Sequence, residues 1–465
     1  MRLALLLPLL LATTSATAET VLEREQAVHG RAIAAGYKAL TLCSATFDAG
    51  RTAAQVEALE LVGIYADYEA DVRALTAVVD GAARTVSVAF DDARPPRIAA
   101  WRPNLGCAQL PIGAGAGAIA TLPRFDTPAP DLDARPWPLG EQDATSAPRG
   151  DATKLQAAVA DAFDTPAYGS GHATTGVLVV QDGRIVAERY RDGFGPHTSQ
   201  RTWSVAKSLT GALIGVAQQA GDLDPAAPAP VPEWQASGDP RGSITVDQLL
   251  RMSSGLHSDT AVNRTDALYF GGATVAESAT GWPLVHAPGT HFRYANNDSV
   301  LAVHALRAAT GDEARALSRP YTDLFWPLGM TRTRAETDWR GGFVLSSQVW
   351  STARDLARFG LLLQHDGVFE GRRLLPAGWV RAATTPSGPQ PEGDLGYGAT
   401  LWLMTRAPGV PADTFAAMGN RGQYVIVVPS RGVVLVRRGE DPTGQRFDPA
   451  AFVAAVLASL DAPAR

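Results

Sequence analysis

The sequence predicts an α+β protein, in which a split β-sheet encloses a mainly helical region and a small α+β unit comes first. Strand-like runs occur at both ends of residues 151–465, whereas residues 204–382 are mainly helical with loops rich in proline and glycine. The 465 residues are 46% hydrophobic and 19% charged, as in a globular chain. This length exceeds one ordinary core, so a large domain and a smaller one are expected.

The first residues have the pattern of a cleaved secretory signal. Arg2 precedes an apolar run, and small residues follow as far as Ala18. We therefore expect residues 1–18 to be removed and the mature protein to be exported, either to the periplasm or out of the cell. The run is too short to span a bilayer, and no later stretch reaches ~20 uninterrupted apolar residues. No transmembrane segment is therefore expected.

The N-terminal part is expected to be a small α+β domain over residues 19–118. A helical pattern covers residues 21–35, and Val- and Thr-rich runs over residues 75–90 predict a hairpin. Residues 119–150, which are rich in proline and aspartate, are expected to be a linker.

Both cysteines of the chain, Cys43 and Cys107, lie in this N-terminal part. In an oxidising compartment a structural disulfide between them is expected. The alternative is a pair of buried, unpaired thiols.

The remaining residues, 151–465, are expected to form one domain. A helix over residues 154–163 precedes a hairpin over 175–190, whose turn Asp182-Gly183 suits type I′ geometry. Further strands are expected at residues 397–404, 415–418, 424–428 and 432–437, followed by a helix over 449–460.

The first candidate catalytic pair is Ser204 and Lys207, at the start of an apolar helix expected to end near Gly221. Residues three apart on a helix share a face, so the amine can reach the hydroxyl that it must deprotonate. Ser204 also lies at the helix amino terminus, where free N–H groups favour developing negative charge. The spacing therefore predicts a nucleophile and its proton acceptor.

The alternative is that Ser204 simply caps the helix, because Ser-x-x-Lys is a common tetrapeptide and serine is a routine cap. The scarcity of lysine weakens this alternative, because Lys38, Lys154 and Lys207 are the only lysines among 41 basic residues. Arginine cannot give up its proton at accessible pH, whereas a desolvated lysine can. A lysine inside an apolar helix, in a chain that otherwise uses arginine, therefore favours the catalytic interpretation.

The second candidate pair is Tyr294 and Asn296, where a loop enters a new helix. A phenol beside a lysine ammonium loses its proton more readily, so Tyr294 is expected to act as base for Ser204 and as acid for the leaving group. Asn296 is expected to orient the lysine and the substrate. Alternatively, Tyr294 packs at a helix start and Asn296 caps it. The occurrence of both motifs in one chain favours the catalytic interpretation.

Several ordered phrases resemble the serine β-lactamase-related family, class C type, and especially its 6-aminohexanoate-dimer hydrolase-like members. The resemblance covers about residues 155–462 and rests on TWSVAKSLTGALIG, LLRMSSGL, HAPGTHFRYANND, STARDLARFGLLL with GVFEGRRLLPAGW, and MGNRGQYVIVVP. It implies an antiparallel β-sheet flanked by helices and joined to an all-helical subdomain, with the active site between them.

The resemblance also implies a third element on a late strand, usually Lys-Thr-Gly. The corresponding residues here are Ala417, Met418 and Gly419, so the lysine is missing. Because that lysine helps penicillin-recognising enzymes bind the substrate carboxylate, its absence argues against efficient β-lactam hydrolysis or cell-wall peptide cleavage.

Residues 419–423 resemble the Gly-x-x-Gly-Gln segment of the amide and ester hydrolase branch, which implies an oxyanion hole formed by the N–H groups of Ser204 and Asn420. The substrate-cleft candidates are Trp203, Gly419, Arg421, Gly422 and Gln423. The alternative for the glycines is a tight turn between strands. Arg421 either replaces the missing charge or faces solvent, and we favour solvent.

Together these patterns predict an exported serine hydrolase that cleaves a small ester, amide or short peptide through an acyl-enzyme on Ser204, without cofactor or metal. One alternative is a β-lactamase or D-alanyl carboxypeptidase, and another is a non-catalytic envelope binding or sensing module of the same fold. The formal net charge of −6 argues against nucleic acid as a partner. The oligomeric state is left open.

Overall fold

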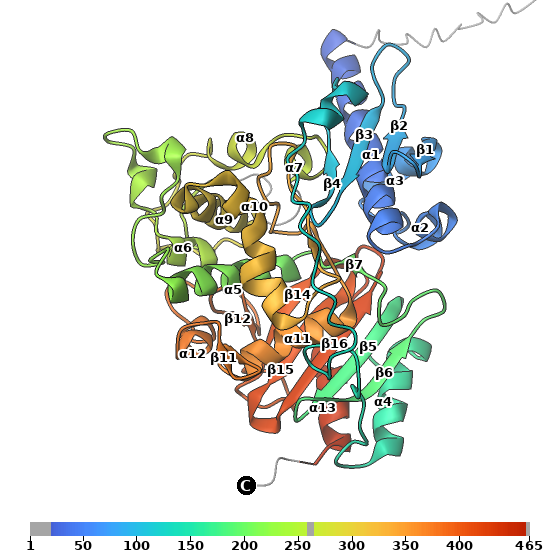
Figure 1. The fold of residues 1–465 in the computed structure, drawn as a ribbon, viewed down its shortest axis with the longest axis vertical. Coiled ribbons are helices and arrows are strands. Elements are labelled where there is room, and N and C mark those ends of the chain that lie inside the picture. The colour runs from blue at the N-terminus through green and yellow to red at the C-terminus, as the bar shows by residue number, and fades with distance from the viewer. Residues whose placement is uncertain (1–19, 258–264, 462–465) are drawn as a thin grey trace, which may run out of the picture.

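The computed structural model describes residues 20–257 and 265–461. The expected signal sequence, residues 1–18, lies outside the described residues. The chain folds into an N-terminal unit, drawn mainly in blue in Figure 1, and a larger C-terminal part, drawn from green through yellow to red.

The N-terminal unit contains three helices and a four-stranded antiparallel sheet (Figure 1). Its helices are α1 (Val21–Phe47), α2 (Ala53–Leu59) and α3 (Ala66–Ala74), and its strands are β1 (Ala77–Asp80), β2 (Thr85–Val88), β3 (Arg97–Arg102) and β4 (Gly106–Gln109). The predicted hairpin is present as β1 and β2. The first helix is longer than predicted because its second half, rich in small residues, is buried against β3 and the rest of the sheet.

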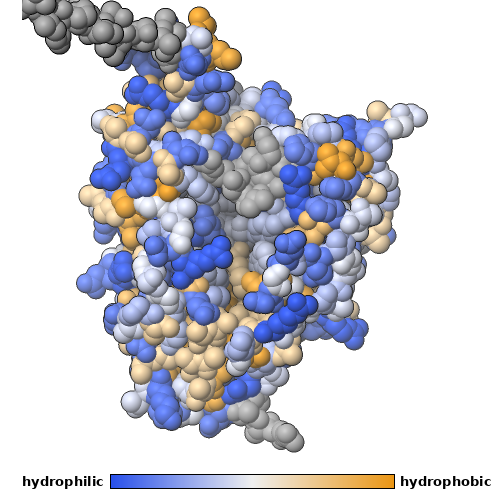
Figure 2. Space-filling view, turned by 180° about the vertical axis from the view of Figure 1, so that it is seen from behind, coloured by the Kyte–Doolittle hydropathy of each residue, from blue (hydrophilic) through white to orange (hydrophobic). Residues whose placement is uncertain are grey.

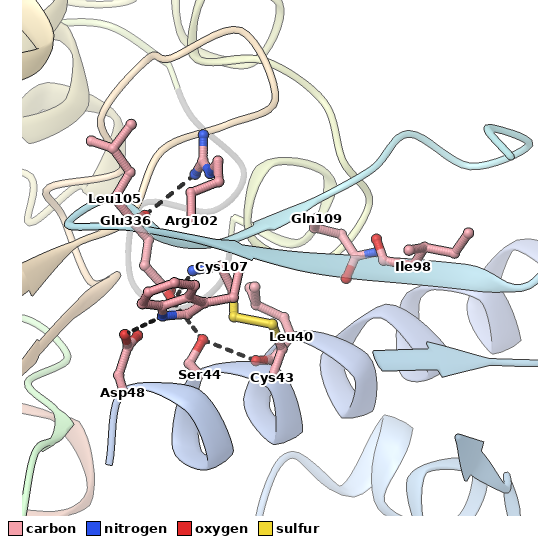
Figure 3. Close-up of a disulfide and its surroundings, with 11 residues drawn as sticks. Leu40, Cys43, Ser44, Asp48, Ile98, Arg102, Leu105, Cys107, Gln109 and Glu336 are labelled. Carbon is pink, nitrogen blue, oxygen red and sulfur yellow. Dashed lines mark hydrogen bonds between the residues drawn. A yellow bond between two sulfur atoms is a disulfide. The ribbon is translucent and has the colours of Figure 1, made fainter. Parts of the chain in front are cut away.

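A disulfide between Cys43 on α1 and Cys107 on β4 joins the helix to the sheet, with Cα atoms 6.2 Å apart (Figure 3). The predicted pairing is confirmed. Glu336, from the C-terminal part, lies beside it and accepts hydrogen bonds from the Cys107 N–H (3.1 Å) and from the Ser44 hydroxyl. Burial raises the pKa of Glu336 to about 8. The disulfide therefore lies where the N-terminal unit packs on the rest of the molecule.

The main sheet has seven antiparallel strands in the order β12-β13-β14-β15-β16-β5-β6. They are β5 (Thr174–Gln181), β6 (Arg184–Tyr190), β12 (Gly396–Tyr397), β13 (Trp402–Leu403), β14 (Phe415–Gly419), β15 (Gln423–Val428) and β16 (Val433–Gly439). Because β16 pairs with β5, the sheet is assembled from both ends of the region, as predicted. Asp182 and Gly183 both have positive φ, as a type I′ turn requires.

The expectation of one strand over residues 397–404 is wrong. Thr400 adopts a left-handed conformation, with φ at 61°, and reverses the chain so that Tyr397 on β12 pairs with Trp402 on β13. The run is therefore two short strands at one edge of the sheet.

Helices cover both faces of the main sheet (Figure 1). On one face α4 (Ala152–Asp164) and α13 (Pro449–Ser459) pack on Val433 and Leu435, and on the other α11 (Ala353–Gln364) packs on the alternate residues Val434 and Val436. Alternate side chains of a strand point to opposite faces, so a nearly continuous apolar strand such as β16 is buried on both sides.

A helical region lies beside the sheet. Its helices are α5 (Val205–Ala220), α6 (Val246–Leu250), α7 (Asp266–Tyr269), α8 (Val275–Ala279), α9 (Asn296–Thr310) and α10 (Glu313–Arg319), with α12 (Trp379–Ala383) nearer the sheet edge. A small sheet of β7 (Gln200–Arg201), β9 (Val349–Ser351) and β8 (Arg334–Ala335) connects the two regions. This mixed architecture confirms the predicted fold class.

Residues 119–150 contain little regular structure, but they pack against the C-terminal part. Trp137 is buried and donates a hydrogen bond to the Gly183 carbonyl (2.8 Å). Glu141 forms ion pairs with Arg354 (2.5 Å) and Arg358 (2.8 Å) of α11. The segment expected to be a linker thus follows the surface of the C-terminal part instead of crossing open solvent.

Within residues 20–257 and 265–461, no helix has both the length and the apolar character needed to cross a membrane. Figure 2 shows hydrophilic and apolar residues interspersed over the face opposite to Figure 1, with a hollow near its middle.

Removing the disulfide should destabilise the protein. The bond closes a loop with a sequence separation of 64, for which the chain-entropy model gives a contribution of about 4 kcal/mol. We expect the Cys43→Ser/Cys107→Ser variant to lose about that much free energy of unfolding in urea titrations. An unchanged free energy of unfolding in the double variant would contradict the structural role.

Candidate active site

Ser204 lies in the turn between β7 and α5. Trp203 adopts a left-handed conformation (φ 49°), which is costly for a bulky residue and persists only where the surroundings hold it. The Arg201 guanidinium stacks 3.7 Å from the centre of the Trp203 ring. The Ser204 side chain forms no hydrogen bond that caps α5. The interpretation of Ser204 as an ordinary helix cap is therefore wrong, and its hydroxyl points elsewhere.

That hydroxyl meets Lys207, whose amine is buried and contacts three oxygen atoms. Lys207 Nζ lies 3.0 Å from Ser204 Oγ, 2.6 Å from Asn296 Oδ1 and 3.0 Å from the Ser346 carbonyl oxygen. Asn296 opens α9 without acting as its N-cap, so its expected role in orienting the lysine agrees with the geometry. Three separate segments thus hold one amine.

Burial lowers the pKa of Lys207 to about 7. A neutral amine has two N–H donors and one lone pair. The Asn296 and Ser346 oxygens can only accept, so they take the two N–H bonds. The lone pair then faces Ser204 Oγ, whose O–H can donate to it. This arrangement places a proton acceptor directly against the hydroxyl.

Tyr294 completes the group from the loop before α9. Its ring lies 5.0 Å from Lys207 Nζ and packs against Trp402 on β13, with ring centroids 5.3 Å apart. Burial raises the pKa of Tyr294 well above the usual range for a phenol, and hydrogen bonding with Ser204 acts in the opposite direction. The expectation that Tyr294 loses its proton more readily is wrong, because burial of the phenol raises its pKa by more than its hydrogen bonds lower it. Tyr294 keeps its proton at neutral pH.

The end of β14 passes close to the backbone of Ser204. A side chain on Gly419 would place its Cβ 3.1 Å from Ser204 N and closer still to the Thr202 carbonyl oxygen. Gly419 has ordinary extended dihedral angles, so the glycine is required by this close approach and not by its conformation. The end of β14 therefore lies against the turn that carries Ser204.

We refer to residues 419–423, which the family resemblance predicts to supply an oxyanion-hole N–H, as the oxyanion loop. The expectation that Arg421 faces solvent is wrong, because the residue is only 4% exposed. Its guanidinium pairs with Glu440 (2.8 Å) and donates to the carbonyl oxygens of Leu59, Val62 and Gly63 in the N-terminal unit. Arg421 therefore neither meets solvent nor replaces the missing lysine.

The other residues of the oxyanion loop support its backbone. Gln423 is buried, donates to the Gly439 carbonyl and accepts from Arg438 (2.7 Å). Gly422 has a positive φ (79°), and a side chain there would overlap the Arg437 guanidinium. Gly422 and Gln423 thus fix the backbone of the loop through their buried contacts.

Three groups at the site carried no sequence signal. Ser346 contributes a backbone carbonyl, which any residue type provides. Tyr65, from the N-terminal unit, accepts a hydrogen bond from Asn420 (3.3 Å). Trp402 lay inside an expected strand with nothing to mark its contact with Tyr294.

The comparisons with known proteins agree with this geometry. A family model described as Beta-lactamase matches residues 159–458. The chain belongs to the beta-lactamase family. The match includes Ser204, Lys207 and Tyr294 and leaves out the N-terminal unit, so the family predicted from the ordered phrases is confirmed.

Relatives of this beta-lactamase family member include hydrolases. The 6-aminohexanoate-dimer hydrolase of Paenarthrobacter ureafaciens is 27% identical over 301 residues, which cover 58% of this chain and 73% of that protein. A family VIII carboxylesterase structure has a TM-score of 0.54 and 17% identity, covering 68% of this chain and 98% of the other. A class C beta-lactamase structure has a TM-score of 0.51 and 15% identity, covering 67% and 98%. The two structures show the shared fold.

Removing the Arg421 side chain should destabilise the protein strongly, because Glu440 would be left buried without its partner. Breaking one partner of a buried pair typically costs about 3–5 kcal/mol, so we expect a loss of this size for Arg421→Ala in chemical denaturation. Arg124→Ala, which removes an exposed partner of Asp126, should change the free energy of unfolding little. Equal losses in both variants would refute the structural role of Arg421.

Proposed function

We propose that this chain is an exported serine hydrolase that cleaves a small ester or amide through an acyl-enzyme on Ser204. The observation that carries the proposal is the buried amine of Lys207, 3.0 Å from Ser204 Oγ with a pKa of about 7. A serine hydroxyl is a weak nucleophile by itself and requires an adjacent base.

In the first half of the reaction, the Ser204 proton passes to Lys207 Nζ as Oγ attacks the substrate carbonyl carbon. The negative charge that develops on the carbonyl oxygen is stabilised by the N–H groups of Ser204 and Asn420. The tetrahedral intermediate collapses when the bond to the leaving group breaks. The neutral phenol of Tyr294 gives its proton to the leaving oxygen or nitrogen and is reprotonated from Lys207.

In the second half, water attacks the acyl-enzyme. Lys207, again neutral, receives a proton from the water, directly or through Tyr294, and the same two N–H groups stabilise the second oxyanion. Collapse of this intermediate releases the acid and returns the proton to Ser204 Oγ. Both halves use the same residues, so no cofactor enters the scheme.

The substrate class follows from the charges near the site. At the position of the Lys-Thr-Gly lysine the chain has Ala417, which is buried and uncharged, and Arg421 is occupied by Glu440. Neither of these two described residues offers a cation to a carboxylate on the substrate. The named relatives, a 6-aminohexanoate-dimer hydrolase and a carboxylesterase, agree with cleavage of an amide or ester bond.

The altered Lys-Thr-Gly position also favours a second candidate, a binding or sensing module that recognises its ligand without turnover. A covalent adduct on Ser204 would exclude this candidate. Turnover of nitrocefin or of a D-alanyl peptide would instead favour a β-lactamase or carboxypeptidase.

Export is supported by the signal-like pattern of residues 1–18 and by the disulfide, because such bonds persist in oxidising compartments.

The proposal predicts that Ser204→Ala lowers turnover of a p-nitrophenyl ester by roughly 10⁴-fold or more. A fluorophosphonate probe should label the wild type at Ser204, as located by peptide mass spectrometry, and should fail to label Lys207→Ala. Ser430→Ala, a change of a surface serine that bonds Asp413, is the matched control and should retain activity. Full activity in Ser204→Ala would reject the proposal.

The pH profile should report the titration of Lys207. Below its pKa of about 7 the amine is protonated and cannot accept the Ser204 proton, so kcat/KM should fall about tenfold per pH unit. Above that pH it should reach a plateau, because Tyr294 keeps its proton into the alkaline range. The profile is measured with an uncharged ester at constant ionic strength. A profile that is flat through pH 7 would show that no base titrates there and would contradict this role for Lys207.

A further inference from the structure

The N-terminal unit contacts the oxyanion loop although it lies outside the part of the chain that the family model matches. Figure 1 shows this unit next to β7, the strand that comes just before Ser204 in the chain. Its contribution comes from the residues that connect α2 to α3.

The first contact is a backbone anchor. The Arg421 guanidinium donates to the carbonyl oxygens of Leu59 (3.0 Å), Val62 (3.0 Å) and Gly63 (3.1 Å). The Gly63 carbonyl also accepts from the N–H of Thr443 (2.8 Å). Leu59 is the last residue of α2, and Val62 and Gly63 lie in the loop that follows it. By donating to all three carbonyls, Arg421 ties the oxyanion loop to the N-terminal unit.

The second contact is made by Tyr65, immediately before α3. Its hydroxyl accepts a hydrogen bond from Asn420 Nδ2 (3.3 Å). Its ring meets Trp203 edge-on, with ring centroids 6.5 Å apart and an interplanar angle of 86°. Tyr65 therefore touches both segments that supply the oxyanion hole, at Asn420 itself and at the residue before Ser204.

Both of these segments hold a costly backbone conformation. Trp203 has φ at 49° and Arg421 has φ at 54°, in the left-handed region that residues with side chains rarely adopt. Such conformations persist where the surroundings over-determine them, and oxyanion donors are effective only when they are held in place before the reaction. Tyr65 is placed to hold both segments at once.

We propose that Tyr65 is a positioning residue for the oxyanion hole, and that the N-terminal unit is in this way a working part of the active site. The inference rests on the proposed function. Tyr65 acts through Asn420 and Trp203 on the two N–H groups. Its loss should therefore weaken stabilisation of the transition state more than binding of the substrate.

The experiment compares Tyr65→Phe and Tyr65→Ala with the wild type. The matched control is Tyr68→Phe, which removes a hydroxyl of the same unit that bonds Asp266 in the C-terminal part. For each protein, kcat and KM are measured with a p-nitrophenyl ester. Affinity for phenylboronic acid, which forms a tetrahedral anion on the serine oxygen, is measured by titration. Thermal unfolding confirms that each variant is folded.

Loss of one hydrogen bond should lower kcat by roughly 3- to 10-fold in Tyr65→Phe, with KM nearly unchanged. Boronate affinity should fall by the same factor. Loss of the ring as well should lower kcat about 100-fold in Tyr65→Ala, the scale expected for misplaced groups at a reacting centre. Tyr68→Phe should remain within about twofold of the wild type. Should Tyr65→Ala not fold, Tyr65→Phe decides the question.

Wild-type kcat and boronate affinity in Tyr65→Phe would reject the positioning role and leave the proposed function intact. A raised KM with unchanged kcat would also reject it, because Tyr65 would then act only in substrate binding. If the wild type itself forms no adduct on Ser204 with the fluorophosphonate probe, the proposed function fails and this inference fails with it.

Discussion

The buried amine of Lys207 is the constraint on which the rest of the site depends. A charged ammonium in this position would lose its hydration, so burial lowers the pKa of Lys207 to about 7. Three segments supply oxygen atoms that contact the amine. Those partners require α5, the start of α9 and the segment before β9 to converge on one atom. The glycines of α5 allow two other segments to pack closely on this helix, because a side chain at Gly211 would overlap Thr400 and one at Gly215 would overlap Trp379.

Much of the fold could be predicted because its signals are local. The turn at Asp182-Gly183, the apolar run of β16 and the two-cysteine count each indicated the structure that formed. Strands β3 and β4 gave no such signal. Both are buried on their two faces, so the alternation of polar and apolar residues that indicates a half-exposed strand is missing. The reversal at Thr400 depends on a left-handed threonine, which no residue preference would suggest.

In the site too, some contacts could be predicted from local sequence signals and others could not. Ser204 and Lys207 lie one helical turn apart, so their contact follows from spacing alone. Arg421 was misjudged because arginine is usually exposed, and its burial depends on Glu440 and on carbonyls of a distant unit. Tyr65 is separated from Asn420 by 355 positions, and the contact carries no motif. Tyr294 is less acidic than expected because burial disfavours its phenolate, and burial does not show in a short motif.

The same electrostatics bear on substrate choice. Burial alone accounts for the lowered pKa of Lys207, without help from a neighbouring cation. An anionic group brought close to this amine would favour its protonated form and raise its pKa, which would remove the base when it is needed. An enzyme with the Lys-Thr-Gly lysine can offset that effect with a second positive charge. In this chain Ala417 and the occupied Arg421 provide no such offset. A substrate with a carboxylate would therefore bind without a partner for its charge at these positions, and it would also raise the pKa of Lys207. An uncharged ester or amide leaves Lys207 able to accept the proton of Ser204.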